Sequence, residues 1–255
     1  GAKEPLTLKT AGNKILNYLS KTMVMTIPII MGAAMFRTIA VVCGDGMLGI
    51  WSADSDIYNF FYNWIYNAGY YFLPVYLGWA AAKQLGCSQP LGMMLGGVLI
   101  APEFMTMVNA AADSGVTTTM VYGVLPAQLN NYSATVLPMV LSMPVLMVVE
   151  KFMKKIIPDM LSTVFVPVGT MAVMIPVSLC VLAPIGSVLG STVGNFMFGL
   201  GNAGGIVTIL SLVVIAALWE FLVMTGMHQV LLTLGIVQLL TLGSDSCVMV
   251  AAGIS

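Results

Sequence analysis

Charged side chains are scarce in this sequence. Of its 255 residues, 9 are Lys or Arg and 10 are Asp or Glu, so only 7% are charged. A soluble globular chain carries about 25% charged residues, and this smaller number cannot cover a water-soluble particle. The scarcity therefore excludes a soluble enzyme. It also argues against nucleic-acid binding, because neutralising phosphates requires many Lys and Arg side chains.

Motifs of soluble chemistry are lacking as well. The sequence has no phosphate-binding GxxxxGK[ST] loop, no GxSxG and no HExxH. Its four cysteines form no CxxC pair, and the single histidine is not close to them in sequence. They are Cys43, Cys87, Cys180 and Cys247. We therefore expect no metal site, no cofactor and no catalytic residue in this chain.

Long apolar runs are what the sequence does have, with 59% hydrophobic residues. A membrane-spanning helix needs about 20 apolar residues, so the length allows roughly seven to nine spans. A transmembrane barrel is disfavoured because it would show alternating segments of about ten residues. The sequence predicts an all-α polytopic membrane protein. The first five spans are expected at 22–43, 57–82, 90–112, 132–149 and 161–183.

The 60 residues from Met160 to Trp219 carry no charge. One helix of that length would be about 90 Å long at 1.5 Å per residue, whereas the bilayer core is about 30 Å thick. The run must therefore fold back, and we expect breaks at Pro184–Gly186 and in the glycine-rich stretch 199–205. Broken or re-entrant helices are the prediction for this second half.

Loop charges alternate along the chain. Lysines precede the first span, follow the second at Lys83 and follow the fourth at 151–155, whereas the loops after spans one and three are acidic or uncharged. An excess of Lys marks the cytoplasmic side of a membrane, so the N-terminus is expected in the cytoplasm. The sequence predicts four parts, and we expect it to be a piece of a longer protein. They are an amphipathic cytoplasmic segment 1–21, a four-span part 22–149, a cytoplasmic linker 150–161, and a second, partial membrane part 162–255.

Two cationic or titratable residues within apolar segments are candidate binding residues. Arg37 is the only arginine, and it lies inside the first predicted span. A charge at the bilayer centre costs at least about 2.5–3.5 kcal/mol, so Arg37 should face a cavity or a partner, unless it reaches the nearer interface. His228, the only histidine, follows Gly226 and can donate, accept and titrate near neutral pH. Glu220 could pair with either of them or lie at an interface.

Polar and small residues at helical spacing give further candidates. Asn59, Asn63 and Asn67 recur every four residues beside tyrosines. This stripe predicts either a path for a sugar or an interfacial aromatic belt, and its start at the acidic, outer end of the span favours the belt. Asn67 is kept as a candidate for the substrate path, with Glu220 and Gly226. Glu103, after Pro102, is expected at a helix end. Glycines at 186, 190 and 194 predict a packing face.

The order of several sequence blocks resembles the sugar-translocating IIC domain of the bacterial phosphoenolpyruvate-dependent phosphotransferase system. The nearest branch is the sucrose, trehalose and β-glucoside group of the glucose superfamily. The matching blocks are Pro28–Arg37, Tyr71–Pro74, Ala81–Lys83, Tyr132–Ser133, Val136–Pro138, Val149–Phe152, Pro184–Gly186 and Gly226–His228.

The resemblance implies a homodimeric elevator-type carrier with several passes through the bacterial cytoplasmic membrane. In it, residues 22–149 would form the scaffold and dimerisation part, and residues 162–255 would be a partial sugar-transport part. A IIB domain phosphorylated on cysteine would phosphorylate the bound sugar, and no phosphorylated residue is identified in this chain. The resemblance assigns sugar binding to His228 and, as the family's first-span basic residue, to Arg37. The family's Gly-Ile-Thr-Glu-Pro-like motif, whose glutamate also binds sugar, is absent from this sequence.

Two other functions fit the same features. An ion-coupled secondary transporter also uses broken helices, and it would accumulate an unmodified solute. A membrane scaffold subunit would bind no solute and would tolerate loss of His228. Arg37 and His228, both within apolar segments, argue against the scaffold.

Overall fold

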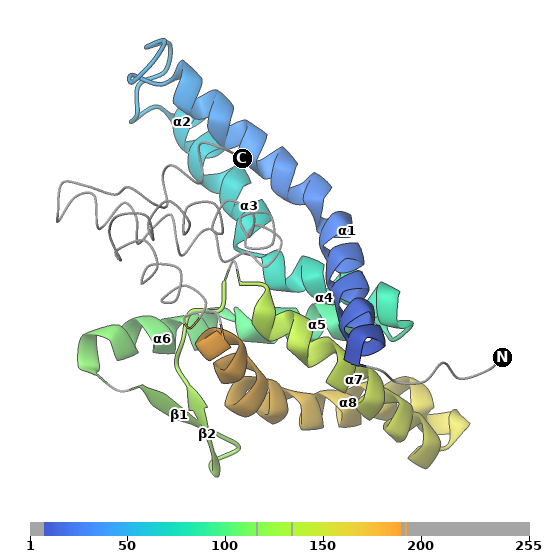
Figure 1. Cartoon of the computed structure of the whole chain (residues 1–255). Coiled ribbons are helices and arrows are strands. Elements are labelled where there is room, and N and C mark those ends of the chain that lie inside the picture. Colours follow the sequence, from blue (N-terminus) through green and yellow to red (C-terminus); the bar gives the residue numbers. More distant parts are fainter. Residues whose placement is uncertain (1–7, 116, 134, 190–191, 193–255) are drawn as a thin grey trace, which may run out of the picture.

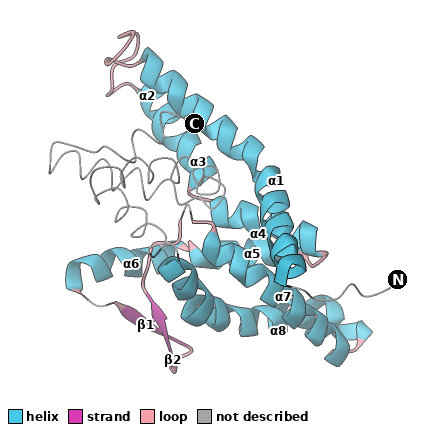
Figure 2. Cartoon of the chain, viewed as in Figure 1, coloured by secondary structure: helices cyan, strands magenta, loops and turns pink. Residues whose placement is uncertain are grey.

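The computed structural model describes residues 8–115, 117–133, 135–189 and 192. Helices make up most of this part of the chain (Figures 1 and 2). In the described residues, seven helical segments come before the first strand: α1 Leu8–Cys43, α2 Asp56–Asn59, η1 Phe60–Ile65, α3 Tyr66–Tyr70, α4 Leu73–Leu85, α5 Gln89–Leu99 and α6 Pro102–Ser114. The later elements are β1 Thr118–Val121, β2 Leu125–Gln128, α7 Leu137–Ile156, α8 Asp159–Val177 and η2 Ser178–Leu182.

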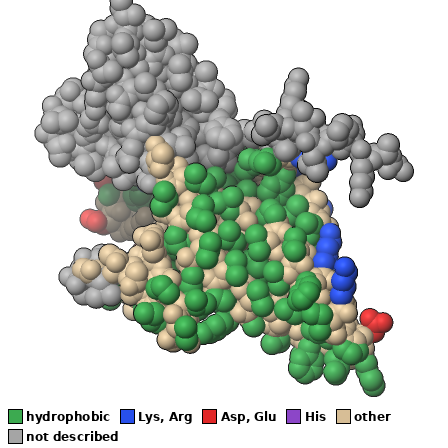
Figure 3. Space-filling view, turned by 60° about the horizontal axis from the view of Figure 1, so that its bottom comes forward, with side chains coloured by type: hydrophobic (Ala, Val, Ile, Leu, Met, Phe, Trp, Pro, Cys, Tyr) green, Lys and Arg blue, Asp and Glu red, His purple; other side chains and the backbone are tan. Residues whose placement is uncertain are grey.

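Three helices in the described residues are long and apolar enough to cross a membrane. They are Asn13–Cys43, Gln89–Ala111 and Asp159–Leu189. Figure 3 shows one broad face on which hydrophobic side chains predominate, with Lys and Arg side chains along one edge. Large apolar residues on α8, such as Val164 and Phe165, are exposed on the molecular surface. A surface of this kind suits lipid, so the structure supports a membrane protein.

Predicted spans one, three and five overlap these three helices, whereas spans two and four do not, and the helix ends also differ from the prediction. Residues 8–21 of the predicted N-terminal segment and the first span form one helix, α1, of 36 residues. The second span begins in α2, continues through the π-helical η1 and α3, and breaks at Tyr71–Phe72 before α4. The third breaks between α5 and α6, where Pro102 begins a new helix and Glu103 lies in its first turn, as expected for a helix end. Helix α7 continues to Ile156, so most of the predicted 150–161 linker is helical.

The loop after the third predicted span contains a β-hairpin. Strands β1 and β2 pair antiparallel, with Thr118 opposite Gln128 and Val121 opposite Leu125. β-branched Thr and Val favour a pleated strand, and Ala127 of β2 is fully buried. The prediction of an all-α chain is therefore corrected in this detail.

The expected break at Pro184–Gly186 is not observed, because the last described helix continues to Leu189. Proline clashes with the carbonyl four residues earlier and removes a hydrogen bond. Here the helix widens just before Pro184: η2 has π-helical geometry, and the Ala183 N–H donates to the Ser178 carbonyl, five residues back. A π-turn thus absorbs the proline without ending the helix.

Tyrosine hydroxyls donate to carbonyls where the helices are interrupted. Tyr18 of α1 donates to the Val140 carbonyl at 3.1 Å, the carbonyl that Pro144 of α7 cannot reach because it has no N–H. Tyr71 donates to the Ile100 carbonyl, between α5 and α6, at 3.3 Å. These bonds join elements far apart in sequence at points where their own backbone ladders are incomplete.

The closest helix crossing lies between α4 and α5. A Cβ on Gly78 would overlap the Gly92 carbonyl, and a Cβ on Gly96 would overlap the Pro74 carbonyl. Leu77 and Leu95 are fully buried beside this contact. Gly92 and Gly96 are spaced as in the small-xxx-small packing of membrane helices. Backbone touches backbone here, and the rest of the core packs around the crossing.

This crossing predicts opposite effects for two glycine substitutions in α5. Gly92→Ala should destabilise the protein by about 1–3 kcal/mol, the usual cost of overpacking, because its methyl group meets the Gly78 backbone. Gly97→Ala meets no atom within 4 Å and should be neutral or stabilising by up to about 1 kcal/mol through helix propensity. Thermal unfolding in detergent measures both, and equal midpoints for the two variants would contradict the packing argument.

Candidate functional site

Arg37 lies in the last third of α1 and is held by two tyrosine rings of the second span. Its Nη2 donates a hydrogen bond of 2.7 Å to the Tyr62 hydroxyl. The guanidinium carbon lies 4.3 Å from the ring centroid of Tyr62 and 4.2 Å from that of Tyr66. Cation–π contact of this kind is worth about 0.5–1 kcal/mol when exposed and about 2 when desolvated. The charge therefore has partners within the protein, as its position in an apolar segment requires.

The tyrosines around Arg37 belong to a longer aromatic ladder. Tyr58 stacks on Tyr62 at 5.2 Å, and Tyr66 stacks on Tyr70 at 4.4 Å between ring centroids. Tyr62 lies within the π-helical η1, and π-turns occur often at functional sites. Arginine offers five N–H donors, so hydrogen bonds to the Tyr62 and Tyr66 hydroxyls leave the half-buried guanidinium with capacity for a polar ligand.

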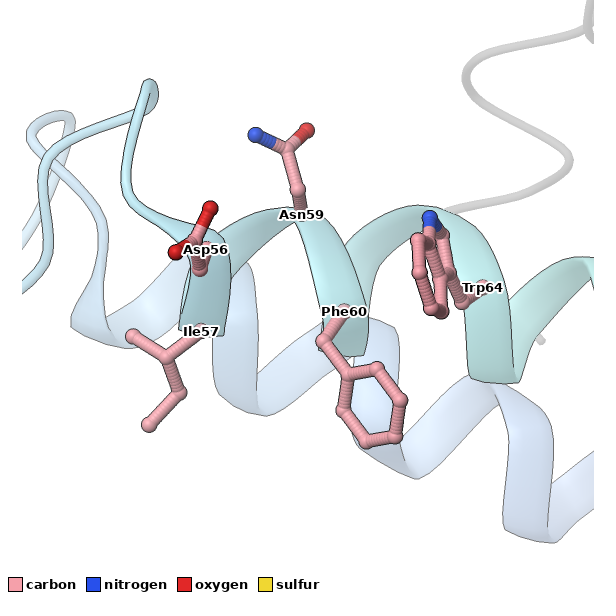
Figure 4. Close-up of a pocket in the computed structure, with 5 residues that line it drawn as sticks. All are labelled: Asp56, Ile57, Asn59, Phe60 and Trp64. Carbon is pink, nitrogen blue, oxygen red and sulfur yellow. The ribbon is translucent and has the colours of Figure 1, made fainter.

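The predicted asparagine stripe is formed in part. Asn63 donates to the side-chain oxygen of Asn59 at 3.0 Å, and Asn67 is exposed on α3. A shallow groove of about 390 Å³ beside this stripe is lined by Asp56, Ile57, Asn59, Phe60 and Trp64. Figure 4 shows Ile57 and Phe60 pointing away from Asn59 along the same helix. One helix supplies the whole lining, and Trp64 is 70% exposed, so the groove suits an interfacial aromatic belt better than a solute site.

A buried carboxylate on α7 joins that helix to the start of α5. The Glu150 side chain, on α7, is 3% exposed. Its Oε2 accepts 2.9 Å from the backbone N–H of Ser88, the N-cap of α5, and its Oε1 accepts from Lys154 one turn later. The Ser88 side chain makes no cap bond itself. Glu150 thus supplies both the missing cap and the negative charge that a helix N-terminus favours.

Glu150 also lines a pocket of about 620 Å³ between the α4–α5 turn and the start of α8. Its charged lining residues are Glu150, Lys154 and Asp159, which sum to one negative charge. Burial, and after it the negative charge of Glu150, raise the pKa of the Cys87 thiol in this lining. The thiol therefore stays protonated at neutral pH and is a poor nucleophile.

Sequence comparison decides between the classes of membrane protein. The model of the family "Phosphotransferase system, EIIC" matches residues 20–253, nearly the whole chain. The chain belongs to this EIIC family. The match includes Arg37, the Glu150 block and the segment with His228, Glu220 and Gly226. Those last three residues lie outside the described part of the structure.

Curated relatives agree with the EIIC assignment. The chain is 34% identical over 232 residues to a mannose-specific EIIBCA component of Corynebacterium glutamicum, covering 89% of this chain and 32% of the relative. It is 28% identical over 228 residues to an arbutin-, cellobiose- and salicin-specific EIIBC component of Escherichia coli, covering 89% and 45%. A sucrose-specific EIIBC component of Klebsiella pneumoniae is 27% identical over 222 residues, covering 85% and 45%.

This EIIC chain thus spans between about a third and a half of the length of these relatives. No solved structure matches it. The resemblance inferred from the ordered sequence blocks is confirmed by the family match and by relatives named for β-glucosides, sucrose and trehalose.

Sequence reasoning missed the role of Glu150. It treated the residue as the start of a lysine-rich linker, although a lone acidic side chain directly after an apolar run was a usable signal. It also missed the partners of Arg37, Tyr62 and Tyr66, although the spacing of the tyrosines was recognised. The pairing depends on how α1 and η1 are rotated against each other, and no local pattern encodes that rotation.

The Glu150 contacts predict unequal effects for the two members of its ion pair. Glu150→Ala leaves the Ser88 N–H without its charged acceptor and should cost about 1.5–3 kcal/mol, the range for hydrogen bonds to charged groups. Lys154→Ala removes a side chain that is 59% exposed and should cost under about 1 kcal/mol. Thermal unfolding tests both variants. A loss in Lys154→Ala as large as that in Glu150→Ala would show that the ion pair, not the cap, carries the stability.

Proposed function

We propose that this chain is the membrane component of a sugar phosphotransferase system, which binds a sugar and translocates it for phosphorylation by a IIB domain. The match of the EIIC family over residues 20–253 carries this proposal. The relatives named EIIBC or EIIBCA support a IIB partner, fused or separate. The chain contributes binding and passage, and the phosphoryl group comes from the partner.

The substrate is a sugar with a hexose unit. The relatives are named for β-glucosides, sucrose, trehalose, mannose and glucose. Our proposal is a β-glucoside, sucrose or trehalose type of substrate, and the mannose-specific and glucose-specific relatives add free hexoses to the sugars that must be tested.

His228 and Arg37 are the proposed sugar-binding residues, and Asn67, Glu220 and Gly226 are proposed to line the substrate path. The geometry around Arg37 supports its part: the guanidinium is half-buried, is fixed by two rings and has donors to spare. Imidazole and guanidinium groups both bond sugar hydroxyls. Neither group would transfer phosphate in this mechanism.

The proposed topology places the N-terminus in the cytoplasm of a bacterium, with the protein in the cytoplasmic membrane as a homodimer. The pocket brings the α4–α5 turn next to the α7–α8 turn, so Lys83 and Lys151–Lys155 lie toward the same end of the molecule. Lys clustering at one end supports a cytoplasmic location for that end. Re-entrant helices in the part after Leu189 and a dimeric scaffold in the first four spans complete the proposal.

A vesicle assay tests the function. Right-side-out vesicles containing the protein and its IIB partner are loaded with phosphoenolpyruvate and the general phosphotransferase proteins, then given labelled sugars. We expect sugar-phosphate in the lumen only with phosphoenolpyruvate. His228→Ala should lower it at least about a hundredfold, since a polar site rejects its ligand strongly when one partner is lost. Glu103→Gln, at an exposed helix start, is the matched control.

Free sugar that accumulates without phosphoenolpyruvate and collapses with an ionophore would instead identify an ion-coupled transporter. Normal transport by a monodisperse His228→Ala protein would overturn the histidine assignment. Absence of any sugar binding by the wild-type protein would support the scaffold reading.

Arg37 can be tested separately from its packing role. Arg37→Ala should weaken sugar binding by roughly tenfold or more, as loss of a charged hydrogen bond predicts. Tyr62→Phe removes only the Tyr62 hydroxyl, which accepts from Arg37, and should keep affinity within about threefold. Equilibrium binding of labelled sugar to purified protein measures both. An Arg37→Ala protein that unfolds more easily yet binds sugar normally would show that Arg37 is solely an anchor between α1 and η1.

A further inference from the structure

The C-terminal half of the last described helix has an incomplete ladder of backbone hydrogen bonds. Pro176 lies inside α8 and has no N–H to donate to the Ala172 carbonyl. The π-helical η2 follows directly, and Pro184 comes next. Prolines and π-turns are two of the few causes of helix kinks, so residues 172–184 are the natural place for this helical stretch to bend.

The β-hairpin supplies the bond that Pro176 cannot. The Tyr122 hydroxyl, at the hairpin turn, donates to the Ala172 carbonyl at 3.0 Å. Fifty residues separate the two in sequence, so the contact exists only because the hairpin folds back onto α8. In Figure 1 the hairpin lies beside the end of α8 and below α6.

Tyr122 reaches this carbonyl through an unusual backbone conformation. Its φ is +53°, and no other non-glycine residue in the described part of the chain has a positive φ. A bulky residue in the left-handed region costs of order 1–3 kcal/mol, and such strain persists only where the surrounding structure fixes it. A glycine at position 122 would adopt this φ without the cost, as Gly123 does at φ +72°, but glycine has no hydroxyl to donate.

A second contact ties the same hairpin to the π-turn. The Cys180 thiol of η2 donates a weak bond of 3.9 Å to the Leu125 carbonyl of β2. Ala127, also on β2, is fully buried. The hairpin is therefore fastened to α8 on both sides of Pro176, at Ala172 and at Cys180, and it spans the weakened stretch.

We propose that Tyr122 is a positioning residue for transport: its hydroxyl holds the hairpin against α8 and so fixes the course of α8 and η2 across Pro176. Its role in transport rests on the proposed sugar-carrier function. Its effect on the helix does not, because that follows from the Ala172 contact alone. Tyr122 itself touches no substrate in this proposal.

Hydrogen exchange of the intact protein in detergent tests the contact through a double-mutant cycle. Tyr122→Phe keeps the ring and backbone but loses the hydroxyl, so amides in 177–183 should exchange about fivefold faster, the factor for one hydrogen bond of ordinary strength. Pro176→Ala restores an N–H for the Ala172 carbonyl. In that background Tyr122→Phe should change exchange by less than about twofold.

Tyr76→Phe is the matched control, since it removes a tyrosine hydroxyl that donates to another helix carbonyl, that of Ala68. It should leave exchange in 177–183 unchanged. The proposal is overturned if Tyr122→Phe speeds amide exchange in 177–183 equally in the wild-type and Pro176→Ala backgrounds. It is also overturned if Tyr76→Phe speeds this exchange as much as Tyr122→Phe does. If Pro176→Ala does not fold, the comparison of Tyr122→Phe with Tyr76→Phe decides alone.

A transport assay separates positioning from binding. Sugar-phosphate formation by Tyr122→Phe should show a kcat reduced about fivefold with KM within twofold of wild type, because the hydroxyl lies outside the sugar site. A raised KM with normal kcat would overturn the role in positioning. If the wild-type protein forms no sugar-phosphate, the proposed function fails, and the exchange measurements still decide whether Tyr122 fixes the course of α8 and η2.

Discussion

The structure depends on one constraint: a backbone carbonyl that has lost its helical partner must find another in apolar surroundings. An unpaired polar group there costs several kcal/mol. This chain places prolines inside three of its long helices, at Pro28, Pro144, Pro167 and Pro176. Tyrosine hydroxyls from distant elements serve two of the resulting carbonyls, those of Val140 and Ala172. The interruptions of the helices thus become the points where elements are joined.

A charged side chain lies at each end of the molecule, and each is stabilised mainly by neutral groups or by a neighbour in its own helix. At one end Arg37 lies between tyrosine rings, which accept a cation without a second charge. At the other, Glu150 is buried but accepts two hydrogen bonds, one from a helix N-terminus and one from Lys154. Each buried charge is satisfied by neutral or local partners, so neither needs a long-range ion pair.

The sequence was sufficient for the class of the protein and its family, and three of its five predicted spans overlap helices that are long and apolar enough to cross a membrane. Composition and long apolar runs depend only on local hydrophobicity, so the class of protein can be predicted from them without the structure. The hairpin at 118–128 was missed because a Thr-rich stretch among helices reads as a loop until its partner α8 is known. The helix was expected to stop at Pro184, but it widens into a π-turn, and that choice depends on packing around η2. The contacts of Arg37 and Glu150 needed the rotation and approach of separate helices, which single-sequence patterns do not contain.

The Glu150 cap has a consequence for how the protein is made. Ser88 receives its acceptor from a residue 62 positions later in the chain. A ribosome therefore delivers α4 and α5 to the membrane well before the carboxylate that completes the start of α5 has been synthesised. Until α7 is made, water must take the place of the Glu150 carboxylate at the Ser88 N–H. Helices α4 and α5 can pack together early because their glycine contact lies within the pair. The turn between them becomes fixed only when α7 packs beside it and brings Glu150 to Ser88.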